Sequence, residues 1–199
     1  VRGLVDEGRI GAVNLVRTDH NQDTQFDARP WWTSVEQVGG GALISSGIHM
    51  LDQLRWFGGD PVEVFCATQT IPERHDAEAL AVVTARFAGG GIGTLDMSWV
   101  APSKPWYQFL IVYGTTGRIT TLGDDVVIAT RDSVETISRP PDLPEHDSFI
   151  NEVRYFGECL RDSVAPETDM HDALRTQVFL DAAYRSAREN RPIPIDYAE

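Results

Sequence analysis

Between Val62 and Ile137, apolar and polar residues alternate with a period of two, which is the pattern of half-buried β-strands. Clusters of glycine and aspartate interrupt the alternation, and these residues are typical of tight turns. One such cluster, Ala88 to Gly91, joins two of the runs as a hairpin. The predicted strands are Val62 to Thr70, Leu80 to Phe87, Ile92 to Val100, Tyr107 to Tyr113, Arg118 to Thr121, Val126 to Ala129 and Val134 to Ile137.

Three segments show the helical period instead. The first, Ala42 to Phe57, follows a run of three glycines and ends at Gly58-Gly59. The other two, His146 to Asp162 and His171 to Glu189, each place apolar residues on one face. These residues are Phe149, Val153, Phe156 and Leu160 on the earlier helix, and Leu174, Val178 and Ala182 on the later one.

The beginning of the chain indicates a helix end followed by a strand. Leu4 to Glu7 is typical of a last helical turn, and Ile10 to Thr18 alternates like a strand. Because the pattern opens inside a helix, we expect sequence upstream of Val1. The segment Asp19 to Val38 is polar, aromatic and irregular, which predicts a long loop on the substrate side. A short strand, Ile193 to Ile195, is predicted at the other end.

The order of elements predicts an α+β fold. Many consecutive strands followed by helices favour a large, mostly antiparallel sheet with helices on one face. A length of 199 residues, 42% of them hydrophobic, suits a single domain spanning residues 1–199. The other face of such a sheet is uncovered and partly apolar, so we expect a homodimer or homotetramer formed through it.

Charge and cysteine content narrow the class of protein. With 17 Lys and Arg against 30 Asp and Glu, the net charge is −13, which argues against nucleic-acid or membrane binding. No apolar run approaches the roughly 20 residues of a membrane-spanning helix. Cys66 and Cys159 form no CxxC pair, so we interpret them as small core residues and expect a cytoplasmic protein.

Candidate chemistry lies on the first long helix. At helical spacing, Ser45, His49 and Asp52 share one polar stripe beside an apolar stripe of Ile44, Ile48 and Leu51. A histidine is well suited to proton transfer, so His49 can accept a proton from a hydroxyl within reach. A plain structural role remains open, since a lone histidine is often a core residue and Asp52 is also spaced to pair with Arg55.

The run GGGALISSGIHMLDQLRWFGGDPVEV resembles the C-terminal domain of the glucose–fructose oxidoreductase and inositol dehydrogenase family (Gfo/Idh/MocA type). In that family a glycine-rich turn leads into a helix reading Asp-x-Gly-x-His-x-x-Asp, followed by Leu-x-Trp and Gly-x-Pro. Three further runs resemble the family in the same order and extend the likeness over essentially the whole chain. They are GRIGAV, VYGTTGRI and FLDAAYRSARENRPIPI.

The resemblance implies an NAD- or NADP-dependent dehydrogenase acting on a sugar, polyol or related secondary alcohol. His49 matches the family histidine that contacts the reacting hydroxyl and helps to deprotonate it. Gly47 matches the glycine two residues earlier, and Asp52 matches an acid that can bind the substrate. Such a protein would have a small-molecule sugar or polyol as its partner, and no metal is implied: the spacing of His20, His49 and Asp52 fits no zinc pattern.

Four further substrate-lining residues are implied by position. Trp106 and Tyr107 precede the Gly-Thr-x-Gly turn, where relatives place aromatic substrate contacts. His20 and Asn21 follow the first predicted strand, at another lining position. The alternatives stay open: packing explains Trp106 and Tyr107 equally well, and a solvated loop explains His20 and Asn21.

Two departures from the family pattern bear on function. Where the family has an acid four residues before the histidine, this chain has Ser45. A serine can only donate or accept a hydrogen bond at the substrate. No GxGxxG motif occurs, so the N-terminal Rossmann domain that binds the cofactor is absent, and we expect no cofactor-binding residues in this chain. The alternatives are a non-catalytic ligand-binding or assembly module, and a nicotinamide-using glycosidase or epimerase.

Overall fold

The structure is a computed structural model that describes residues 1–24, 34–73, 76–101, 107–139 and 147–197. Its strands are β1 (Val13–Asn21), β2 (Pro61–Thr70), β3 (Glu78–Phe87), β4 (Ile92–Ser98), β5 (Tyr107–Gly114), β6 (Gly117–Leu122), β7 (Asp125–Thr130), β8 (Val134–Ile137) and β9 (Ile193–Pro194). Its helices are α1 (Arg2–Asp6), α2 (Val35–Val38), the π-helix η2 (Leu43–Gly47), α3 (Ile48–Gly58), α4 (Asp147–Asp162) and α5 (Met170–Glu189).

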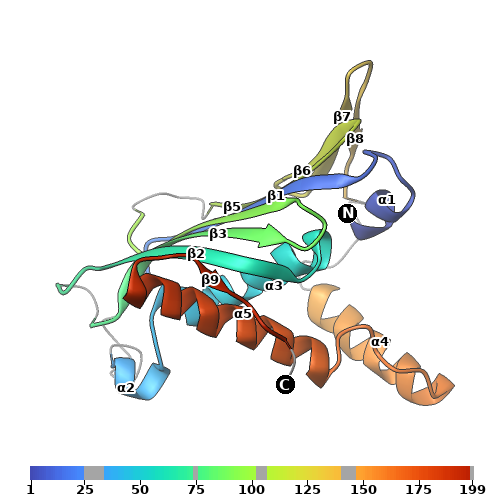
Figure 1. The fold of residues 1–199 in the computed structure, drawn as a ribbon. Coiled ribbons are helices and arrows are strands. Elements are labelled where there is room, and N and C mark those ends of the chain that lie inside the picture. The colour runs from blue at the N-terminus through green and yellow to red at the C-terminus, as the bar shows by residue number, and fades with distance from the viewer. Residues whose placement is uncertain (25–33, 74–75, 102–106, 140–146, 198–199) are drawn as a thin grey trace.

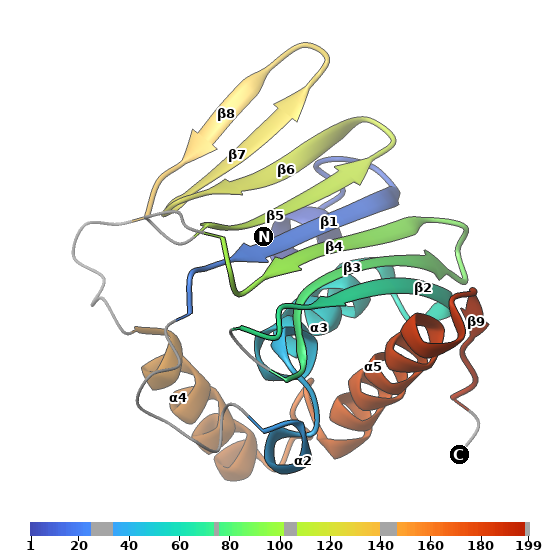
Figure 2. The ribbon, with the colours of Figure 1, turned by 90° about the vertical axis from the view of Figure 1, so that its left-hand side faces the viewer.

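The nine strands form one open sheet in the order β8-β7-β6-β5-β1-β4-β3-β2-β9 (Figure 2). Among the described strands, β1 and β4 pair in parallel, and every other neighbouring pair is antiparallel. Strand β1 lies between β4 and β5. It forms hydrogen bonds with both, in parallel with β4 and antiparallel with β5. The first strand of the chain therefore lies in the middle of the sheet.

Helices α3 and α5 cover one face of this sheet, which we call the inner face (Figure 1). Helix α3 packs on β1 and β4, whereas α5 packs on β2 and on α3. Because side chains alternate along a strand, every second residue of the central strands enters this core. The largest fully buried side chains are Trp99, Phe179, Ile10, Leu43, Leu51, Leu54, Leu95, Ile119, Leu180, Ile193, Val16 and Val64.

The boundaries of α5 follow from local chemistry. Asp169 precedes the helix, and its side chain accepts a hydrogen bond from the Asp172 backbone N–H, which satisfies one of the free donors of the first turn. Asn190 ends the helix in the left-handed conformation, with φ of 51°. The predicted α+β fold, its mostly antiparallel sheet and the three long helical segments are confirmed.

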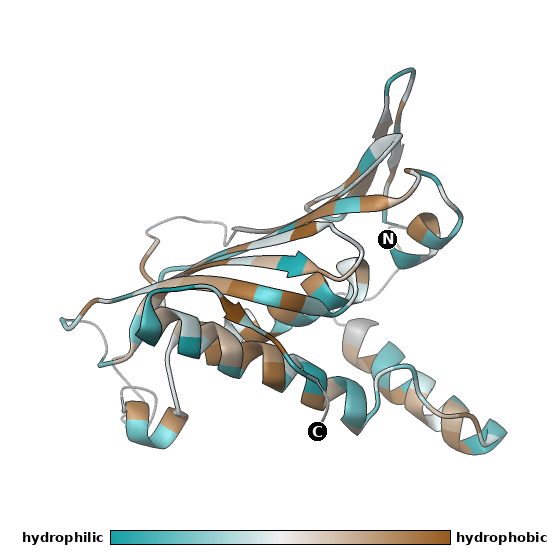
Figure 3. Cartoon of the chain, in the orientation of Figure 1, coloured by the Kyte–Doolittle hydropathy of each residue, from teal (hydrophilic) through white to brown (hydrophobic). Residues whose placement is uncertain are grey.

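Helix α4 forms as predicted, but its apolar face is not buried. The four residues expected to share that face are each more than half exposed: Phe149, Val153, Phe156 and Leu160. The helix extends away from α3 and α5 in Figure 1, and Figure 3 shows apolar and polar residues alternating along it. Its amphipathic pattern therefore has no partner surface within the described residues.

The outer face of the sheet carries apolar side chains that no helix of the described chain covers. Phe65 on β2, Val82 on β3 and Ile92 on β4 are 38%, 51% and 42% exposed. Val82 pairs with Ala67 on β2 and lies diagonally from Phe65, whereas Ile92 pairs with Arg86, so the apolar area lies on β2 and β3. Within the described residues, the expectation that one face of the sheet stays uncovered is confirmed.

The predicted loop from Asp19 to Val38 is wrong at both ends. Strand β1 continues through Asp19, His20 and Asn21, because β4 and β5 pair with these residues from both sides. Their polar side chains broke the expected alternation, but a strand with two hydrogen-bonded neighbours tolerates polar residues. Val35 to Val38 form the short helix α2. The residues between Thr24 and Ser34 lie outside the described part of the chain.

Both cysteines are free and buried, as predicted for small core residues. Cys66 lies on β2 under α5, where its backbone N–H donates to the Ser186 hydroxyl at 2.9 Å. Burial, together with the nearby charge of Glu78, raises the pKa of the Cys66 thiol to about 12. This thiol therefore stays protonated at neutral pH and is a poor nucleophile.

Candidate functional site

The glycine-rich turn leads into a helix whose first residues are held by a carboxylate from the sheet. Glu78, on β3, is only 8% exposed. Its Oε2 accepts a hydrogen bond from Gly41 N at 2.9 Å, and its Oε1 accepts one from Leu43 N at 3.0 Å. Tyr184, on α5, donates its hydroxyl proton to the same Oε1 at 2.8 Å. Glu78 thus takes the place that an anion would occupy at a helix N-terminus.

Gly41 permits close approach between the glycine-rich turn and the sheet, whereas Gly47 is less restricted. A Cβ at Gly41 would lie 2.0 Å from the backbone oxygen of Glu78. At Gly47 it would lie 3.0 Å from the Leu43 side chain and 3.7 Å from the sulfur of Met97 on β4. The distance to Met97 is an ordinary van der Waals contact, so at Gly47 only the Leu43 side chain would have to shift.

His49 lies on the first turn of α3 and is exposed to solvent. Within the described part of the chain it forms no hydrogen bond or ion pair. The apolar stripe beside it behaves as predicted: Leu51 is fully buried, and Ile44 and Ile48 pack against the core. The imidazole is thus free to contact a molecule that approaches this helix.

Ser45 lies in the π-helical turn η2 rather than in a regular α-helix. Each π-helical bond reaches one residue further than an α-helical bond, so this turn is wider. Four residues are still close to one turn of such a helix, so Ser45 and His49 remain neighbours along the chain's first helical turns. A π-helical turn of this kind often occurs at functional sites.

Asp52 is one turn beyond His49, and its carboxylate is engaged by two buried groups. Thr176, on α5, donates its hydroxyl proton to Asp52 Oδ1 at 2.8 Å. The same oxygen lies 3.5 Å from Nη1 of Arg55, whose side chain is 6% exposed. The Asp52 side chain itself remains 43% exposed. We call Ser45, His49 and Asp52 the polar edge.

Arg55 links the polar edge to α5 and to the turn after α3 through hydrogen bonds. Its Nε donates to Asp60 Oδ1 and its Nη2 to Asp172 Oδ1, each at 2.9 Å, while Nη1 donates to Thr176 Oγ1 at 2.6 Å. Burial alone would raise the pKa of Asp60, but hydrogen bonds from Arg175 and Arg55 outweigh it and hold this pKa below its usual value. Of these contacts the sequence indicates only the spacing of Asp52 and Arg55, because the partners on α5 are distant in the chain.

The two candidates on β1 point to opposite faces of the sheet. His20 pairs with Met97 and lies on the inner face, the side on which His49 lies, and its buried Nδ1 has no partner among the described residues. Asn21 lies on the outer face and donates to Asp19 Oδ2 at 3.3 Å. The structure therefore brings His20, but not Asn21, to the side of the polar edge.

Of the two aromatic candidates, Trp106 and Tyr107, only the backbone of Tyr107 belongs to the described residues. Tyr107 is the first residue of β5, and its backbone pairs with Asn21. Its side chain lies outside the described part of the chain, as does the whole of Trp106. A role of either residue in substrate binding stays a prediction.

Asp19 provides a test of the electrostatics of β1. Burial raises its pKa from 3.8 to about 6, although hydrogen bonds from Phe109 N and Asn21 oppose this rise. Between these two pH values the folded state holds a proton that the unfolded state has released, so stability falls as the pH rises through this window. Asp19→Asn should therefore gain stability relative to the wild type between pH 4 and 6.5, by about 2 kcal/mol.

Urea unfolding across this pH range measures the difference. Asp124→Asn is the control, because Asp124 is 78% exposed and should show no such trend. A difference between Asp19→Asn and the wild type that stays constant with pH would contradict the assignment.

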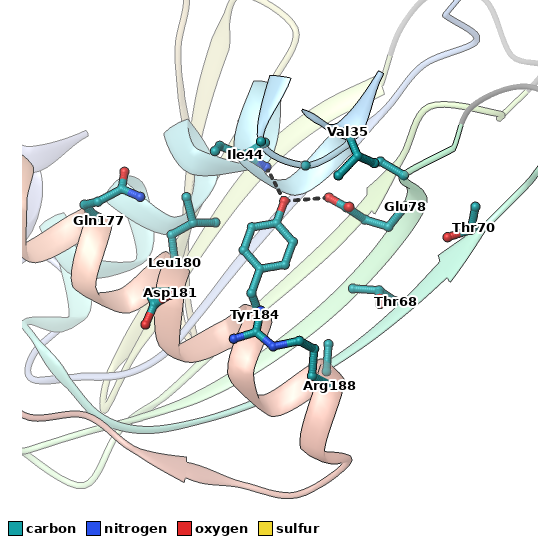
Figure 4. A pocket seen from close by; sticks show the side chains of 14 residues that line it. Val35, Ile44, Thr68, Thr70, Glu78, Gln177, Leu180, Asp181, Tyr184 and Arg188 are labelled. Carbon is teal, nitrogen blue, oxygen red and sulfur yellow. Dashed lines mark hydrogen bonds between the residues drawn. The ribbon is translucent and has the colours of Figure 1, made fainter. Parts of the chain in front are cut away.

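Among the cavities lined by described residues, a small one touches the polar edge and a larger one lies apart from it. A cavity of about 500 Å³ opens between α2, α5 and β2, with Thr68, Asp181 and Arg188 in its wall and the Tyr184–Glu78 hydrogen bond beside it (Figure 4). Neither His49 nor Asp52 lines it. A smaller cavity of about 200 Å³ is lined by Asp52, Arg55, Trp56, Gly59, Asp60 and Asp172. Asp52 therefore faces solvent-accessible space at the polar edge.

The described residues offer no cradle for a dinucleotide. The N–H groups after Gly39-Gly40-Gly41 are the natural place for a phosphate, but Glu78 already accepts from two of them. The sheet is antiparallel except at β1 and β4, so it lacks the parallel strand–helix–strand unit of a Rossmann fold. A nicotinamide cofactor does not fit these residues. They also contain no cluster of three or more metal-ligating side chains, and no helix long and apolar enough to cross a membrane.

Comparison with known proteins places the chain in a family. The sequence model of the GFO/IDH/MocA C-terminal domain matches residues 1–120, more than half of the chain. The chain belongs to this family, and the resemblance carried by the segment from Gly39 to Val64 is confirmed.

Relatives of known activity are dehydrogenases. The D-apiose dehydrogenase of Paraburkholderia graminis is 28% identical over 166 residues, which cover 77% of this chain and 44% of that protein. The myo-inositol 2-dehydrogenase of Thermotoga maritima is 26% identical over 206 residues, covering 98% of this chain and 60% of that protein. The chain thus spans less than two thirds of either relative.

Solved structures share the fold. Levoglucosan dehydrogenase in complex with NADH and levoglucosan superimposes with a TM-score of 0.90 at 19% identity, covering 98% of this chain and 62% of that one. The same enzyme is also known with NADH and L-sorbose. Levoglucosan dehydrogenase thus binds NADH and these sugars, and its likeness to this chain is one of architecture.

Proposed function

We propose that this chain is the substrate-binding and oligomerisation domain of an NAD(P)-dependent oxidoreductase that acts on a sugar, polyol or related secondary alcohol by hydride transfer. The observation that carries the proposal is the polar edge, where His49 is exposed and free while Asp52 is fixed one turn further on. Two dehydrogenases among the relatives support it. In the intact enzyme a separate Rossmann domain, outside residues 1–199, would hold the cofactor.

The residues of the polar edge have distinct tasks in this proposal. A neutral imidazole at His49 accepts the proton of the reacting hydroxyl. The Asp52 carboxylate accepts a hydrogen bond from a second hydroxyl of the same substrate. His20, with its free buried Nδ1 on the inner face, is a further polar contact on this side of the sheet.

Ser45 sets this chain apart from the family pattern. A hydroxyl carries no charge, so it cannot stabilise an imidazolium at His49 as a carboxylate would. In the family that the sequence resembles, the Rossmann domain also supplies a catalytic lysine, and this lysine would then carry more of the proton transfer. Ser45 itself would contribute a single hydrogen bond to the substrate.

The experiment that tests the proposal uses the full-length protein. A panel of sugars and polyols is screened with NAD and with NADP, and the absorbance of the reduced nicotinamide is followed. Turnover of one or more alcohols supports the proposal and names the substrate and the cofactor. If none is oxidised and none binds, the proposed activity is wrong.

Ser45 also favours a second candidate function, a non-catalytic ligand-binding or assembly module that kept the fold after losing the acid. The full-length gene separates the two. A GxGxxG motif and a lysine beside a proline upstream of this domain support the enzyme, and their absence supports the module. A nicotinamide-using glycosidase or epimerase would instead show turnover with no net change of the cofactor.

The uncovered outer face predicts self-association. Residues 1–199 alone should form a dimer or larger assembly through the apolar area around Val82, and light scattering measures the mass. Val82→Glu places a charge in this area and should yield monomers. The control Gln37→Glu adds the same charge on the exposed helix α2 and should leave the assembly intact. A wild-type chain that is a monomer throughout would exclude this interface.

A further inference from the structure

Thr176 is the buried polar residue that links α5 to the polar edge. It is 4% exposed, although it lies on the opposite helix and 124 residues away from Asp52 in the chain. Its hydroxyl accepts a hydrogen bond from Arg55 Nη1 at 2.6 Å and donates one to Asp52 Oδ1 at 2.8 Å. A threonine hydroxyl has a single proton, so the bond from Arg55 directs that proton toward Asp52.

We propose that Thr176 and Arg55 are positioning residues that fix the Asp52 carboxylate in the orientation in which it binds the substrate. The inference rests on the proposed function, because it assigns a task to groups behind the same polar edge. Neither residue is expected to touch the substrate. Both act through Asp52.

Arg55 is itself held in one place. Besides Thr176 it donates to Asp60 and to both the side chain and the backbone oxygen of Asp172. A guanidinium engaged on all its nitrogens has a fixed plane and direction. The orientation of the Thr176 hydroxyl is therefore determined by Arg55.

As a consequence, the two carboxylate oxygens of Asp52 have different surroundings. Oδ1 receives the bond from Thr176 and lies 3.5 Å from Arg55, whereas no described residue donates to Oδ2. The side chain is 43% exposed and lines the cavity of about 200 Å³. Oδ2 is thus the oxygen that remains to accept a hydrogen bond from a substrate hydroxyl.

Two matched variants of Thr176 separate positioning from packing. Thr176→Val keeps the shape but removes the hydroxyl, while Thr176→Ser keeps the hydroxyl and removes a methyl group. In the full-length enzyme, Thr176→Val should raise KM about tenfold, with a change in kcat of less than about threefold, because a bond to a charged group is lost in binding. Thr176→Ser should restore KM to within about threefold of the wild type.

A double-mutant cycle tests whether the effect passes through Asp52. If it does, adding Thr176→Val to Asp52→Ala should change KM by less than about twofold beyond Asp52→Ala alone. Multiplication of the two single effects would overturn the proposal. Equal losses of affinity in Thr176→Val and Thr176→Ser would also overturn it, since they would trace to packing.

Crystal structures of the variants test the positioning without any turnover. In Thr176→Val the Asp52 carboxylate should leave its wild-type orientation, and in Thr176→Ser it should keep it. An unchanged Asp52 in Thr176→Val overturns the inference. If Thr176→Val does not fold, Thr176→Ala serves the same comparison with less crowding around Arg55. This readout also separates two failures: a wild-type enzyme inactive on every alcohol refutes the proposed function, whereas an unmoved Asp52 refutes the positioning role.

Discussion

Replacing His49 by alanine in the full-length protein is expected to lower turnover by about 10²- to 10⁴-fold, the range that a positioned general base contributes. The physical reason is the isolation of this imidazole on α3, where no other described histidine shares the exposed edge. The affinity for the nicotinamide cofactor should fall far less than turnover, because the proposed Rossmann domain, outside residues 1–199, would hold the cofactor. Steady-state kinetics measure the first effect, and fluorescence titration of the reduced cofactor measures the second.

His171→Ala is the matched control for this experiment. His171 is also exposed, but it lies on the first turn of α5 rather than on the polar edge. Its removal should leave turnover within about twofold, as for a surface substitution away from a site. Equal activity of His49→Ala and the wild type would remove His49 from the mechanism, and an equal loss in both variants would point to instability.

The largest effect on stability is expected at Arg55. Its side chain is 6% exposed and neutralises three carboxylates, those of Asp52, Asp60 and Asp172. Arg55→Ala leaves these acids close together without their shared cation, and breaking a buried ion pair in this way costs about 3–5 kcal/mol. Arg55→Lys keeps the charge but not the planar fork, so we expect an intermediate loss. Urea unfolding gives both values.

Arg86→Ala provides the comparison at the surface. Arg86 pairs with Glu63 at 3.7 Å, but the two side chains are 62% and 45% exposed. Such a pair contributes about 0–1 kcal/mol. If Arg55→Ala cost no more than Arg86→Ala, the buried network would have no part in stability.

Most of the fold follows from the sequence because its strands are amphipathic. Alternation along β2, β3 and β4 records which residues face α3 and α5, and the glycine-rich turns record where the chain reverses. The same reasoning fails for β1 beyond Thr18, since Asp19 and Asn21 are polar residues on a strand paired on both sides. Alternation reports exposure of a face and cannot report pairing by neighbouring strands.

The polar edge is predictable only in part. The motif predicts roles for His49 and Asp52, because its spacing is local and resembles a known family. The contacts that hold it are not local: Glu78 comes from β3 and Thr176 from α5. The π-helical turn that contains Ser45 has no signature in spacing either. These features depend on which distant segments meet, and a single sequence does not record that.

The exposed apolar face of α4 also shows that a local pattern predicts an element but not its contacts. Its pattern correctly predicts an amphipathic helix, and the pattern says that some surface should cover Phe156 and its neighbours. The pattern does not indicate which surface this is. Periodicity therefore predicts the element and the need for a partner, but the identity of the partner lies outside the helix.

Glu78 has a consequence for protein engineering. The segment from Gly39 to Asp52 looks like a portable motif, yet its first turn is anchored by a strand residue and its last acid by a residue of another helix. Transplanted alone into a new scaffold, the peptide would lose the carboxylate that satisfies Gly41 and Leu43 and the hydroxyl that orients Asp52. A functional graft would have to carry Glu78, Arg55 and Thr176 with it. The smallest transferable unit is thus a helix together with its strand and its neighbouring helix.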